Sequence, residues 1–286
     1  MKISALINHI VDSLELSGNR DHNNRIAWWI LESITCKSKL KLMFDAEFKL
    51  TDSQAKKLKD WLDKMNQNYP LQYLLGSVPF LNLKINVEAP VLIPRPETEN
   101  WVSELIQKFL PLKDQNLFVL DIGCGTGCIG LALAKAFPNW NVIGVDISDK
   151  ALELSIKNKK ENQLQNINFL KSDLFECVPE KKFDLIVSNP PYISLDQYET
   201  LEGSVAKWED KQALVAPFDG IALIHQIIDL SPEFLEKRFE GFPSLVVEID
   251  STQKERVSKL LQDSPFKKFE IAPDQFLRDR LAVAYF

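Results

Sequence analysis

The feature that most constrains the fold of this chain is a glycine-rich turn between a short apolar strand and a helix. The expected strand covers 117–120, and the expected helix begins after residue 127. The turn has the sequence Asp121-Ile122-Gly123-Cys124-Gly125-Thr126-Gly127. Alternate glycines allow a sharp turn and a close approach of the backbone to a ligand, and the N–H groups at a helix start favour a polar or anionic group. A tight turn without a ligand is the alternative.

From residue 117 onward, short strand patterns alternate with helical patterns. The expected strands are rich in Val, Ile, Leu and Phe, and they cover 117–120, 141–145, 167–170, 183–187 and 245–249, with a terminal strand at 281–286. Strands that alternate with helices are typical of βαβ units and of a parallel sheet covered on both faces. This part of the chain therefore predicts an α/β domain.

The first 70 residues predict a small helical bundle instead. A polar break at 19–24 separates the first two runs of apolar residues at helical spacing. Thr51 and Gln54 form a capping-box pattern that opens the third run. The expected helices cover 7–14, 26–34 and 54–65.

The segment after the bundle predicts a linker. Apolar residues at 80–87 and 91–93 predict two short strands around residues 88–90, which form a hairpin. An amphipathic helix is expected next, over 97–110. The predicted organisation is a helical domain at 1–70, a β-hairpin linker at 71–95 and an α/β domain at 96–286.

Composition and charge argue against several classes of function. The chain has 286 residues and a formal net charge of −6, whereas proteins that hold nucleic acid through phosphates usually show a basic footprint. Its four cysteines and three histidines do not form the clustered set that a structural zinc site needs. The N-terminal residues carry no continuous apolar stretch, and no apolar run approaches the roughly 20 residues that span a bilayer. We expect a cytoplasmic protein with no metal, no membrane partner and no direct nucleic-acid partner.

Two acidic residues after later strands fit a nucleoside-binding site. Asp146 ends the expected strand at 141–145, where a carboxylate can accept both hydroxyls of a ribose. The alternative for Asp146 is an N-cap for a helix that starts near Lys150. Asp173 follows the next expected strand, where it can accept from an adenine amino group while Leu174 packs on the ring. A polar loop carboxylate is the alternative for Asp173.

The expected strand at 183–187 leads into Asn189-Pro190-Pro191-Tyr192. In open α/β sheets, ligands bind outside the carboxyl ends of the strands, so Asn189 is expected beside the glycine turn. Two prolines remove two backbone donors and stiffen the turn. The Asn189 side-chain oxygen and the Pro190 carbonyl remain as acceptors that can hold an NH2 group, a poor nucleophile, toward a methyl donor. Tyr192 can supply a face against the planar group, and a merely rigid loop is the alternative.

The glycine spacing differs from the G-x-G-x-x-G of nicotinamide-dependent oxidoreductases. An acidic residue before G-x-G-x-G resembles motif I of class I S-adenosylmethionine methyltransferases. The resemblance implies a Rossmann-like fold with a seven-stranded, mostly parallel sheet, and S-adenosylmethionine as the cofactor. The turn then holds the methionine moiety, the second acid holds the ribose and the third acid holds the adenine. The cofactor residues so implied are Asp121, Gly123, Cys124, Gly125, Thr126, Gly127, Asp146, Ile147, Asp173, Leu174 and Asn189.

An Asn-Pro-Pro-Tyr sequence behind such a turn resembles N-methyltransferases that act on planar nitrogens. Val-Leu-Ile-Pro-Arg-Pro-Glu-Thr-Glu at 91–99 and Leu-Gln-Tyr-Leu-Leu-Gly at 71–76 further resemble the HemK/PrmC family, the release-factor glutamine N5-methyltransferases. The resemblance covers essentially the whole chain, and its layout is a small helical domain, a hairpin and a methyltransferase domain.

The family resemblance implies a substrate. It implies a monomer that methylates the side-chain amide of the glutamine in the Gly-Gly-Gln loop of peptide-chain release factors, with the helical domain recognising the substrate. The catalytic residues so implied are Asn189, Pro190 and Tyr192. The implied substrate contacts are Asn189, Pro190, Pro191, Tyr192, Arg95 and Glu97.

Other functions stay open at the level of the sequence. A glutamine methyltransferase of a ribosomal protein shares Asn-Pro-Pro-Tyr, and an N-methyltransferase of adenine or guanine in nucleic acid shares both motifs but predicts a basic face. A non-catalytic S-adenosylmethionine-binding subunit would be expected to lack Asn189 or the glycine turn. The chain departs from the family pattern at 209–214, at Ala216-Pro217 and at Asp250, which concerns the wall on the substrate side. Leu174 stands where the family often has an aromatic residue.

Overall fold

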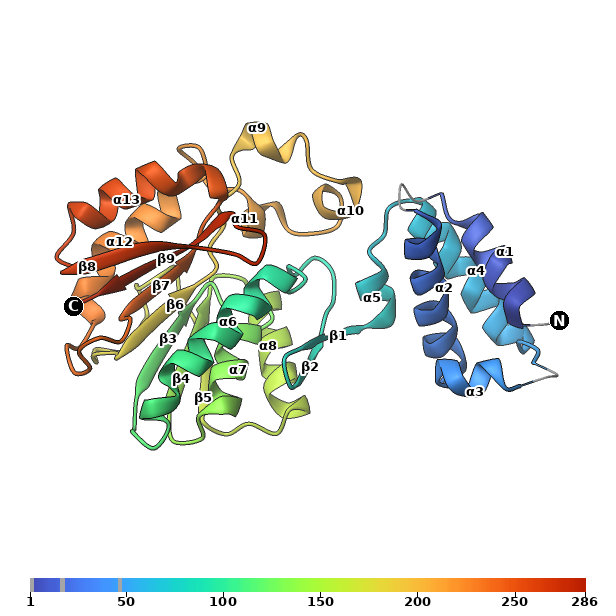
Figure 1. The fold of residues 1–286 in the computed structure, drawn as a ribbon, viewed down its shortest axis with the longest axis horizontal. Helices are drawn as coiled ribbons and strands as arrows, with labels where there is room; N and C mark the ends of the chain where they lie inside the picture. Colours follow the sequence, from blue (N-terminus) through green and yellow to red (C-terminus); the bar gives the residue numbers. More distant parts are fainter. Residues whose placement is uncertain (1–2, 16–18, 46–47) are drawn as a thin grey trace. The chain divides into compact units, whose positions relative to one another are not determined.

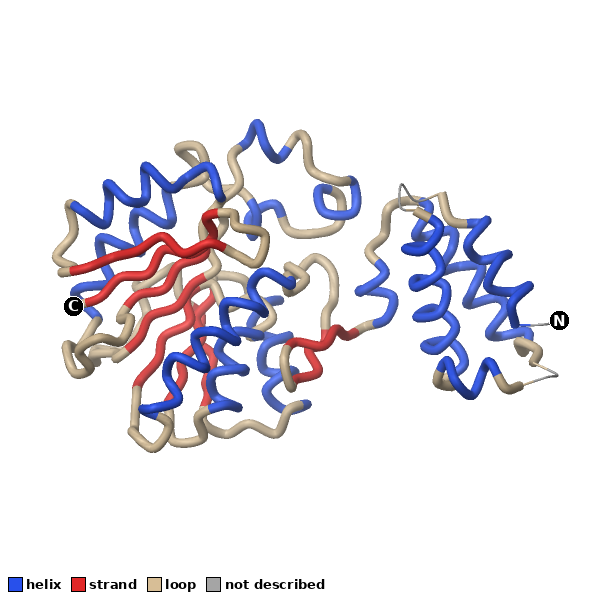
Figure 2. The backbone as a smooth tube through the Cα atoms, viewed as in Figure 1, coloured by secondary structure: helices blue, strands red, loops and turns tan. Residues whose placement is uncertain are grey.

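The computed structural model describes residues 3–15, 19–45 and 48–286, which divide into two compact units. The first unit runs to Gly76 and also includes the later segment Gly203–Trp208, and the remaining residues form the second unit. Figure 1 shows the elements of both units, and Figure 2 shows that helices and loops build the first unit. None of the helices in the described ranges combines the length and the apolar character needed to cross a membrane.

The helices of the first unit pack around an apolar core. They are α1 Ile3–Ser13, α2 Arg20–Thr35, α3 Lys39–Met43, α4 Asp52–Asn66 and α5 Leu71–Leu75. Ile10 of α1 and Ile30 of α2 are fully buried in this core. The predicted capping box is confirmed, because Thr51 and Gln54 each accept the backbone N–H of the other at the start of α4. The helical spacing of the sequence therefore identified the buried faces, except that Trp29, which shares the spacing of the second run, is 50% exposed.

The polar break predicted at 19–24 is wrong from Arg20 onward, because α2 begins there. The Asn19 side chain accepts the N–H of His22 at 2.9 Å and caps the helix. A capped helix can begin with polar residues where its first turns face solvent, so low hydrophobicity did not mean a loop. Residues 1–2, 16–18 and 46–47, which the predicted helical domain includes, lie outside the described residues.

The hairpin predicted for the linker exists, but its position differs from the prediction. The strands β1 Ser77–Phe80 and β2 Leu83–Asn86 pair antiparallel, with Phe80 opposite Leu83. The turn therefore lies at 81–82 and not at 88–90. Residues 91–93, although within the described structure, belong to no strand. Val91 and Ile93 are buried, so their apolar pattern reflects a loop that packs against the core.

The second unit contains a seven-stranded sheet in the order β5-β4-β3-β6-β7-β9-β8. Its strands are β3 Phe118–Ile122, β4 Asn141–Asp146, β5 Ile167–Lys171, β6 Leu185–Ser188, β7 Leu245–Glu248, β8 Lys268–Pro273 and β9 Asp279–Tyr285. Pairing is parallel from β5 to β7, and β9 runs antiparallel to both β7 and β8. The predicted fold class is therefore confirmed. Strand β8 was not predicted, because this edge strand has no fully buried residue that would give it an apolar pattern.

Helices cover both faces of this sheet, as expected for parallel strands. The longer helices are α6 Pro96–Phe109, α7 Cys128–Ala136, α8 Asp149–Glu161, α12 Ala222–Phe234 and α13 Lys254–Gln262. In Figure 1, α6, α7 and α8 lie over one face, and α12 and α13 lie over the other. The short elements are η1 Leu110–Leu112, α9 Leu195–Tyr198, α10 Gly203–Ala206, α11 Lys211–Leu214 and η2 Ser251–Gln253. Strands β6 and β7 are buried throughout, which places the core between these two layers of helices.

The strand order determines where a ligand site can form. Strand β3 pairs with β4 on one side and with β6 on the other, so the connections that leave these strands diverge between β3 and β6. A crevice outside the carboxyl ends of the strands is expected at such a point. The segments after β3, β4, β5 and β6 all leave the sheet at that edge, because the four strands are parallel.

One aromatic ring occupies the space beside two glycines near this edge. A Cβ atom built on Gly144 would lie 2.6 Å from the Phe169 ring, and one built on Gly127 would lie 2.8 Å from it. Gly144 and Phe169 are direct partners in the pairing of β4 with β5. The ring therefore requires glycine in β4 and at the end of the glycine turn.

We predict that Gly144→Ala lowers the free energy of unfolding by about 1–3 kcal/mol, the usual effect of overpacking a core. Denaturant unfolding measures this loss. In the Gly144→Ala/Phe169→Leu double variant, the smaller side chain leaves room for the new methyl group, so the loss should be less than the sum of the single losses. Strictly additive losses would show that the ring is not what excludes a side chain at residue 144.

Candidate active site

A cavity lies at the carboxyl edge of the parallel strands in the second unit. Its walls include residues from the segments that follow β3, β4, β5 and β6. The predicted site residues that line it are Gly123, Gly125, Asp146, Ile147, Asp173, Leu174, Asn189, Pro190 and Pro191. The structure therefore brings together the glycine turn, two of the acidic residues and the Asn-Pro-Pro segment around one space.

The glycine turn is held by hydrogen bonds to the end of β4. Gly123 and Gly125 have φ values of 66° and 55°, a conformation that residues with a side chain rarely adopt. The Cys124 N–H donates to the Val145 carbonyl at 2.9 Å, and the Gly125 N–H donates to Asp146 Oδ2 at 2.8 Å. A Cβ atom at Gly123 or Gly125 would meet no atom of the described residues within 4 Å. The turn is therefore fixed on one side and faces open space on the other.

Asp146 supports the turn and lines the cavity at the same time. Its Oδ2 accepts the Gly125 N–H, and its Oδ1 accepts the Ser148 N–H at 2.9 Å. Ser148 and not Asp146 caps α8, because the Ser148 hydroxyl accepts the N–H of Ala151. The alternative role of Asp146 as a helix cap is therefore wrong. Burial raises the pKa of Asp146, and each oxygen keeps a lone pair for a further donor.

Several predicted cofactor residues are not among the described residues that line the cavity. They are Asp121, Cys124, Thr126 and Gly127. Asp121 is fully buried, and its Oδ2 accepts the N–H of Gly130 at 2.9 Å near the start of α7. Asp121 Oδ1 has no hydrogen-bond partner in the described part of the chain, and burial raises the pKa of Asp121 to about 7. These four residues belong to the turn sequence, whose other members Ile122, Gly123 and Gly125 line the cavity.

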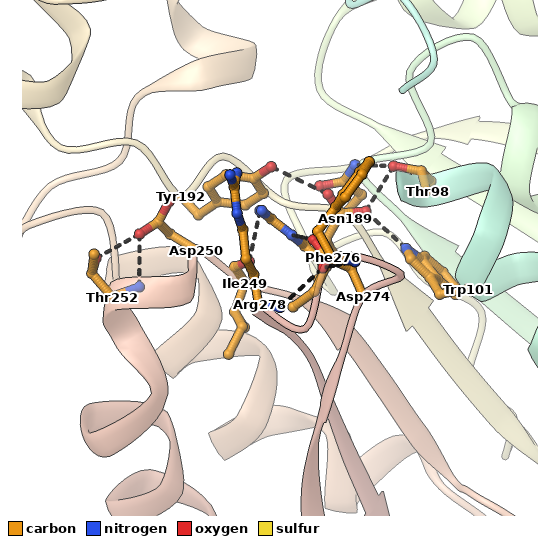
Figure 3. A network of polar contacts seen from close by, with 12 residues as sticks. Thr98, Trp101, Asn189, Tyr192, Ile249, Asp250, Thr252, Asp274, Phe276 and Arg278 are labelled. Carbon is orange, nitrogen blue, oxygen red and sulfur yellow. Dashed lines mark hydrogen bonds and ion pairs between the residues drawn. The ribbon is translucent and has the colours of Figure 1, made fainter. Parts of the chain in front are cut away.

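Asn189 follows β6 directly, and hydrogen bonds hold it at the cavity. The Ser188 hydroxyl donates to the Ile122 carbonyl at 2.8 Å, which joins the end of β6 to the end of β3. Asn189 Nδ2 donates to Thr98 Oγ1 at 3.1 Å (Figure 3). One end of the Asn189 amide is therefore engaged with α6.

Behind Asn189 lies a buried carboxylate to which no sequence motif pointed. Glu248 ends β7 and is 1% exposed. Thr98 Oγ1 and Trp101 Nε1 donate to its Oε2 at 2.7 and 2.8 Å, and the Tyr192 hydroxyl donates to its Oε1 at 3.2 Å (Figure 3). Burial raises the pKa of Glu248, and the donated hydrogen bonds oppose this shift. The only signal in the sequence was an acidic residue inside an otherwise apolar strand.

Tyr192 has its hydroxyl group directed into the protein. It lies outside the set of described residues that line the cavity, and its hydroxyl is directed to Glu248. Burial raises the pKa of Tyr192 above its ordinary value, and the nearby Glu248 carboxylate raises it further. The phenol therefore stays protonated and acts as a hydrogen-bond donor inside the protein.

The predicted substrate residues Arg95 and Glu97 also lie outside the described lining of the cavity. Arg95 Nη2 pairs with Glu209 Oε2 at 2.5 Å, and the Glu209 side chain is almost fully buried. The next residue, Asp210, lines the cavity. Arg95 therefore anchors the segment 209–214, where the chain departs from the family pattern. Glu97 lies in the first turn of α6.

Comparisons with known proteins match most of the chain. The family model of the PrmC N-terminal domain matches residues 5–76, and that of the methyltransferase small domain matches residues 101–205. The release factor glutamine methyltransferase of Fusobacterium nucleatum is 39% identical over 250 residues, covering 87% of this chain and 68% of the relative. Enzymes with the same name from Lactococcus lactis and Salmonella typhimurium are 37% and 35% identical, over 256 and 266 residues. These alignments cover 89% and 93% of this chain, and 90% and 93% of the relatives.

The solved structures agree on the fold. The catalytic domain of human METTL16, in complex with a hairpin of the MAT2A 3′UTR, superposes with a TM-score of 0.55 at 17% identity. The superposition covers 82% of each chain. At this identity, the likeness concerns the arrangement of strands and helices alone.

The buried carboxyl of Asp121 predicts a pH-dependent stability. Its pKa rises from an ordinary 3.8 to about 7, so between these values the folded state holds a proton that the unfolded chain has lost. The free energy of unfolding therefore falls as the pH rises through this range. Asp121→Asn removes the charge and keeps an acceptor for the Gly130 N–H. Its stability relative to the parent protein should increase by up to about 4 kcal/mol between pH 4 and pH 8.

Denaturant unfolding of the cofactor-free proteins at both pH values measures this difference. Because Asp121→Asn could change packing at every pH, the informative quantity is the change in the difference, not its value at one pH. A difference that stays constant from pH 4 to pH 8 would contradict the raised pKa.

Proposed function

The chain belongs to the family of release factor glutamine methyltransferases, and we propose that it methylates the glutamine in the Gly-Gly-Gln loop of peptide-chain release factors. The methyl group moves from S-adenosylmethionine to the side-chain amide nitrogen. The predicted family and the predicted methyl donor are confirmed by the matched family models and relatives. The observation that carries the proposed chemistry is the position of Asn189 in the wall of the cavity that also contains the glycine turn and Asp146.

The cavity wall fits the parts of S-adenosylmethionine, which supplies an electrophilic methyl group when bound. Open space in front of Gly123 and Gly125 suits the methionine moiety. The Asp146 carboxylate stands at the end of β4, where it can accept the ribose hydroxyls. Leu174 and the neighbouring Asp173 line the same cavity, where Leu174 can pack on the planar adenine ring and Asp173 can accept from its amino group. We assign these five residues to cofactor binding.

Asn189 and Pro190 hold the target nitrogen in this proposal. An amide nitrogen is a poor nucleophile, because its lone pair is conjugated with the carbonyl. Asn189 Nδ2 is engaged with Thr98, so its Oδ1 is available to accept one N–H of the substrate, and the Pro190 carbonyl accepts the other. With both N–H groups held, the lone pair turns toward the methyl group. As the N–C bond forms, the bond between the methyl carbon and the donor sulfur would break, leaving a neutral thioether, and one of the two N–H protons would pass to solvent. The acceleration comes from positioning and electrostatics.

Residues outside the cavity complete the proposal. We assign the helical domain, residues 1–70, to recognition of the release factor's body, with the linker at 71–95 and the methyltransferase domain at 96–286. Arg95 acts by anchoring Glu209 beside the wall, whereas Glu97 and Tyr192 remain predicted substrate contacts. The proposed enzyme is a cytoplasmic monomer that acts without nucleic acid or membrane.

We predict that Asp146→Ala weakens S-adenosylmethionine binding at least about tenfold, because each lost hydrogen bond to a charged acceptor contributes roughly 1.5–3 kcal/mol. Calorimetric titration of the folded variant measures this loss. Asp149→Ala is the matched control, because Asp149 is an exposed acid nearby that pairs with Lys171 and is not among the described residues lining the cavity. An affinity of Asp146→Ala equal to that of the control would remove Asp146 from the cofactor site.

We predict that the full chain methylates a release factor on the loop glutamine and on no other residue. Replacing that glutamine by asparagine should reduce methylation strongly, because the shorter side chain cannot bring its nitrogen to the methyl group. Replacing it by glutamate should abolish methylation, since a carboxylate faces two acceptors and an unpaired polar mismatch is rejected strongly. Mass spectrometry of the reacted factor locates the methyl group.

Asn189→Ala is the control for the chemistry. It should reduce turnover by orders of magnitude, since the acceptor that positions the nitrogen is gone. Methylation of another residue, or of ribosomal protein or RNA alone, would refute the proposed substrate. Near-normal turnover by Asn189→Ala would refute the positioning mechanism and leave the substrate assignment intact.

A further inference from the structure

The two ends of an asparagine amide have opposite hydrogen-bond sense. The Oδ1 atom accepts, and the Nδ2 group donates. A half-turn of the Asn189 side-chain amide would therefore present donors to the cavity instead of an acceptor. An NH2 group of a substrate requires acceptors, so the orientation of this amide decides which substrate can bind.

A chain of hydrogen bonds determines this orientation. The Trp101 indole can only donate, and it donates to Oε2 of Glu248 at 2.8 Å, which identifies Oε2 as an acceptor. Thr98 Oγ1 lies 2.7 Å from the same oxygen, so the single hydroxyl hydrogen of Thr98 is directed to Glu248. Only lone pairs of Thr98 Oγ1 remain, and they can accept only the donor end of Asn189, whose Nδ2 lies 3.1 Å away.

Burial leaves the groups in this chain of hydrogen bonds without alternative partners from solvent. Thr98 is 2% exposed and Glu248 is 1% exposed, so water does not offer the hydroxyl an alternative partner at low cost. The reversed amide would place Asn189 Oδ1 against the lone pairs of Thr98 Oγ1. Two acceptor atoms would then face each other with no hydrogen between them. Figure 3 shows Thr98, Trp101 and Asn189 drawn together in this network.

We propose that Glu248 and Thr98 are positioning residues that fix the hydrogen-bond polarity of Asn189, so that the site selects an amide and rejects a carboxylate. The inference rests on the proposed function, because it assigns to these residues the discrimination between glutamine and glutamate. Neither residue touches the substrate. Glu248 acts through Thr98, and Thr98 acts through Asn189.

The test removes the hydroxyl and keeps the shape of residue 98. Thr98→Val should lower kcat roughly 10- to 100-fold, as expected when a positioning contact is lost, and should leave the affinity for S-adenosylmethionine unchanged. Thr98→Ser should restore kcat, because it restores the hydroxyl. Glu248→Gln should keep most of the activity, since its amide oxygen can accept from Thr98 and Trp101 while its NH2 group faces Tyr192. Ser231→Ala is the matched control, because it deletes a buried hydroxyl that donates to the Ile227 carbonyl within α12.

A second measurement separates polarity from general damage to the fold. A release factor with glutamate in place of the loop glutamine should inhibit the Thr98→Val enzyme at least several-fold more strongly than the parent enzyme, because the freed Asn189 amide can turn its NH2 group to the carboxylate. In the Asn189→Ala background, Thr98→Val should cause no further loss of kcat. If Thr98→Val does not fold, Thr98→Ala serves the same comparisons.

The outcomes distinguish the inference from the proposed function. If the parent enzyme methylates the loop glutamine and folded Thr98→Val has the same kcat, the inference is overturned and the proposed function stands. The inference is also overturned if the effects of Thr98→Val and Asn189→Ala multiply, or if inhibition by the glutamate factor does not change. If the parent enzyme methylates no release factor, the proposed function fails, and the inference that rests on it fails as well.

Discussion

The parallel pairing of β3 with β4 on one side and β6 on the other is the constraint on which the site depends. Ile122, near the carboxyl end of β3, lies opposite Val145 of β4 and Ser188 of β6. Asp146 and Asn189 directly follow the residues opposite Ile122, and the first glycine of the turn directly follows Ile122 itself. All three therefore lie at the same edge of the sheet. The Ser188 hydroxyl and the Cys124 N–H add a bond across each side of this junction. Chemistry that needs a cofactor pocket beside a polar acceptor is available here because three strands end together.

Two buried carboxylates flank this junction, and their surroundings differ. Among the described residues, Asp121 accepts a hydrogen bond from the Gly130 N–H, and its other oxygen has no partner. Its charge is therefore poorly compensated inside the fold. Glu248 accepts from three side chains contributed by α6 and by the segment after β6. The surroundings of Asp121 therefore reduce the stability of the protein at high pH. The surroundings of Glu248 instead fix the directions of the hydrogen bonds that its carboxylate accepts.

The local sequence pattern predicted most of the fold. It failed where apolar residues are buried outside a strand, or where a strand has no fully buried residue. Each expected strand of the parallel sheet was found. The strands β3, β6 and β7 are almost entirely buried and rich in apolar residues, whereas the edge strand β5 still carries apolar residues although most of it is not buried. The hairpin turn was misplaced since Val91 and Ile93 are buried in a loop. Strand β8 was missed because exposed charged residues interrupt its apolar ones and none of its residues is fully buried. At the site, the motifs located the glycine turn and Asn189, which line one cavity. The Thr98–Glu248 contact joins residues 150 positions apart, and no local pattern reports such a distance.

The first unit is discontinuous in sequence, since Gly203–Trp208 belongs with the helices that end at Gly76. The Trp208 ring packs edge-on against Tyr69, with ring centroids 4.7 Å apart. During synthesis on the ribosome, the helices can form early, but this aromatic contact cannot form until the chain has grown past residue 208. By then β3 to β6 have also been made. The amino-terminal unit is thus the first to be translated, but its last segment reaches it only after four strands of the sheet in the other unit have been made.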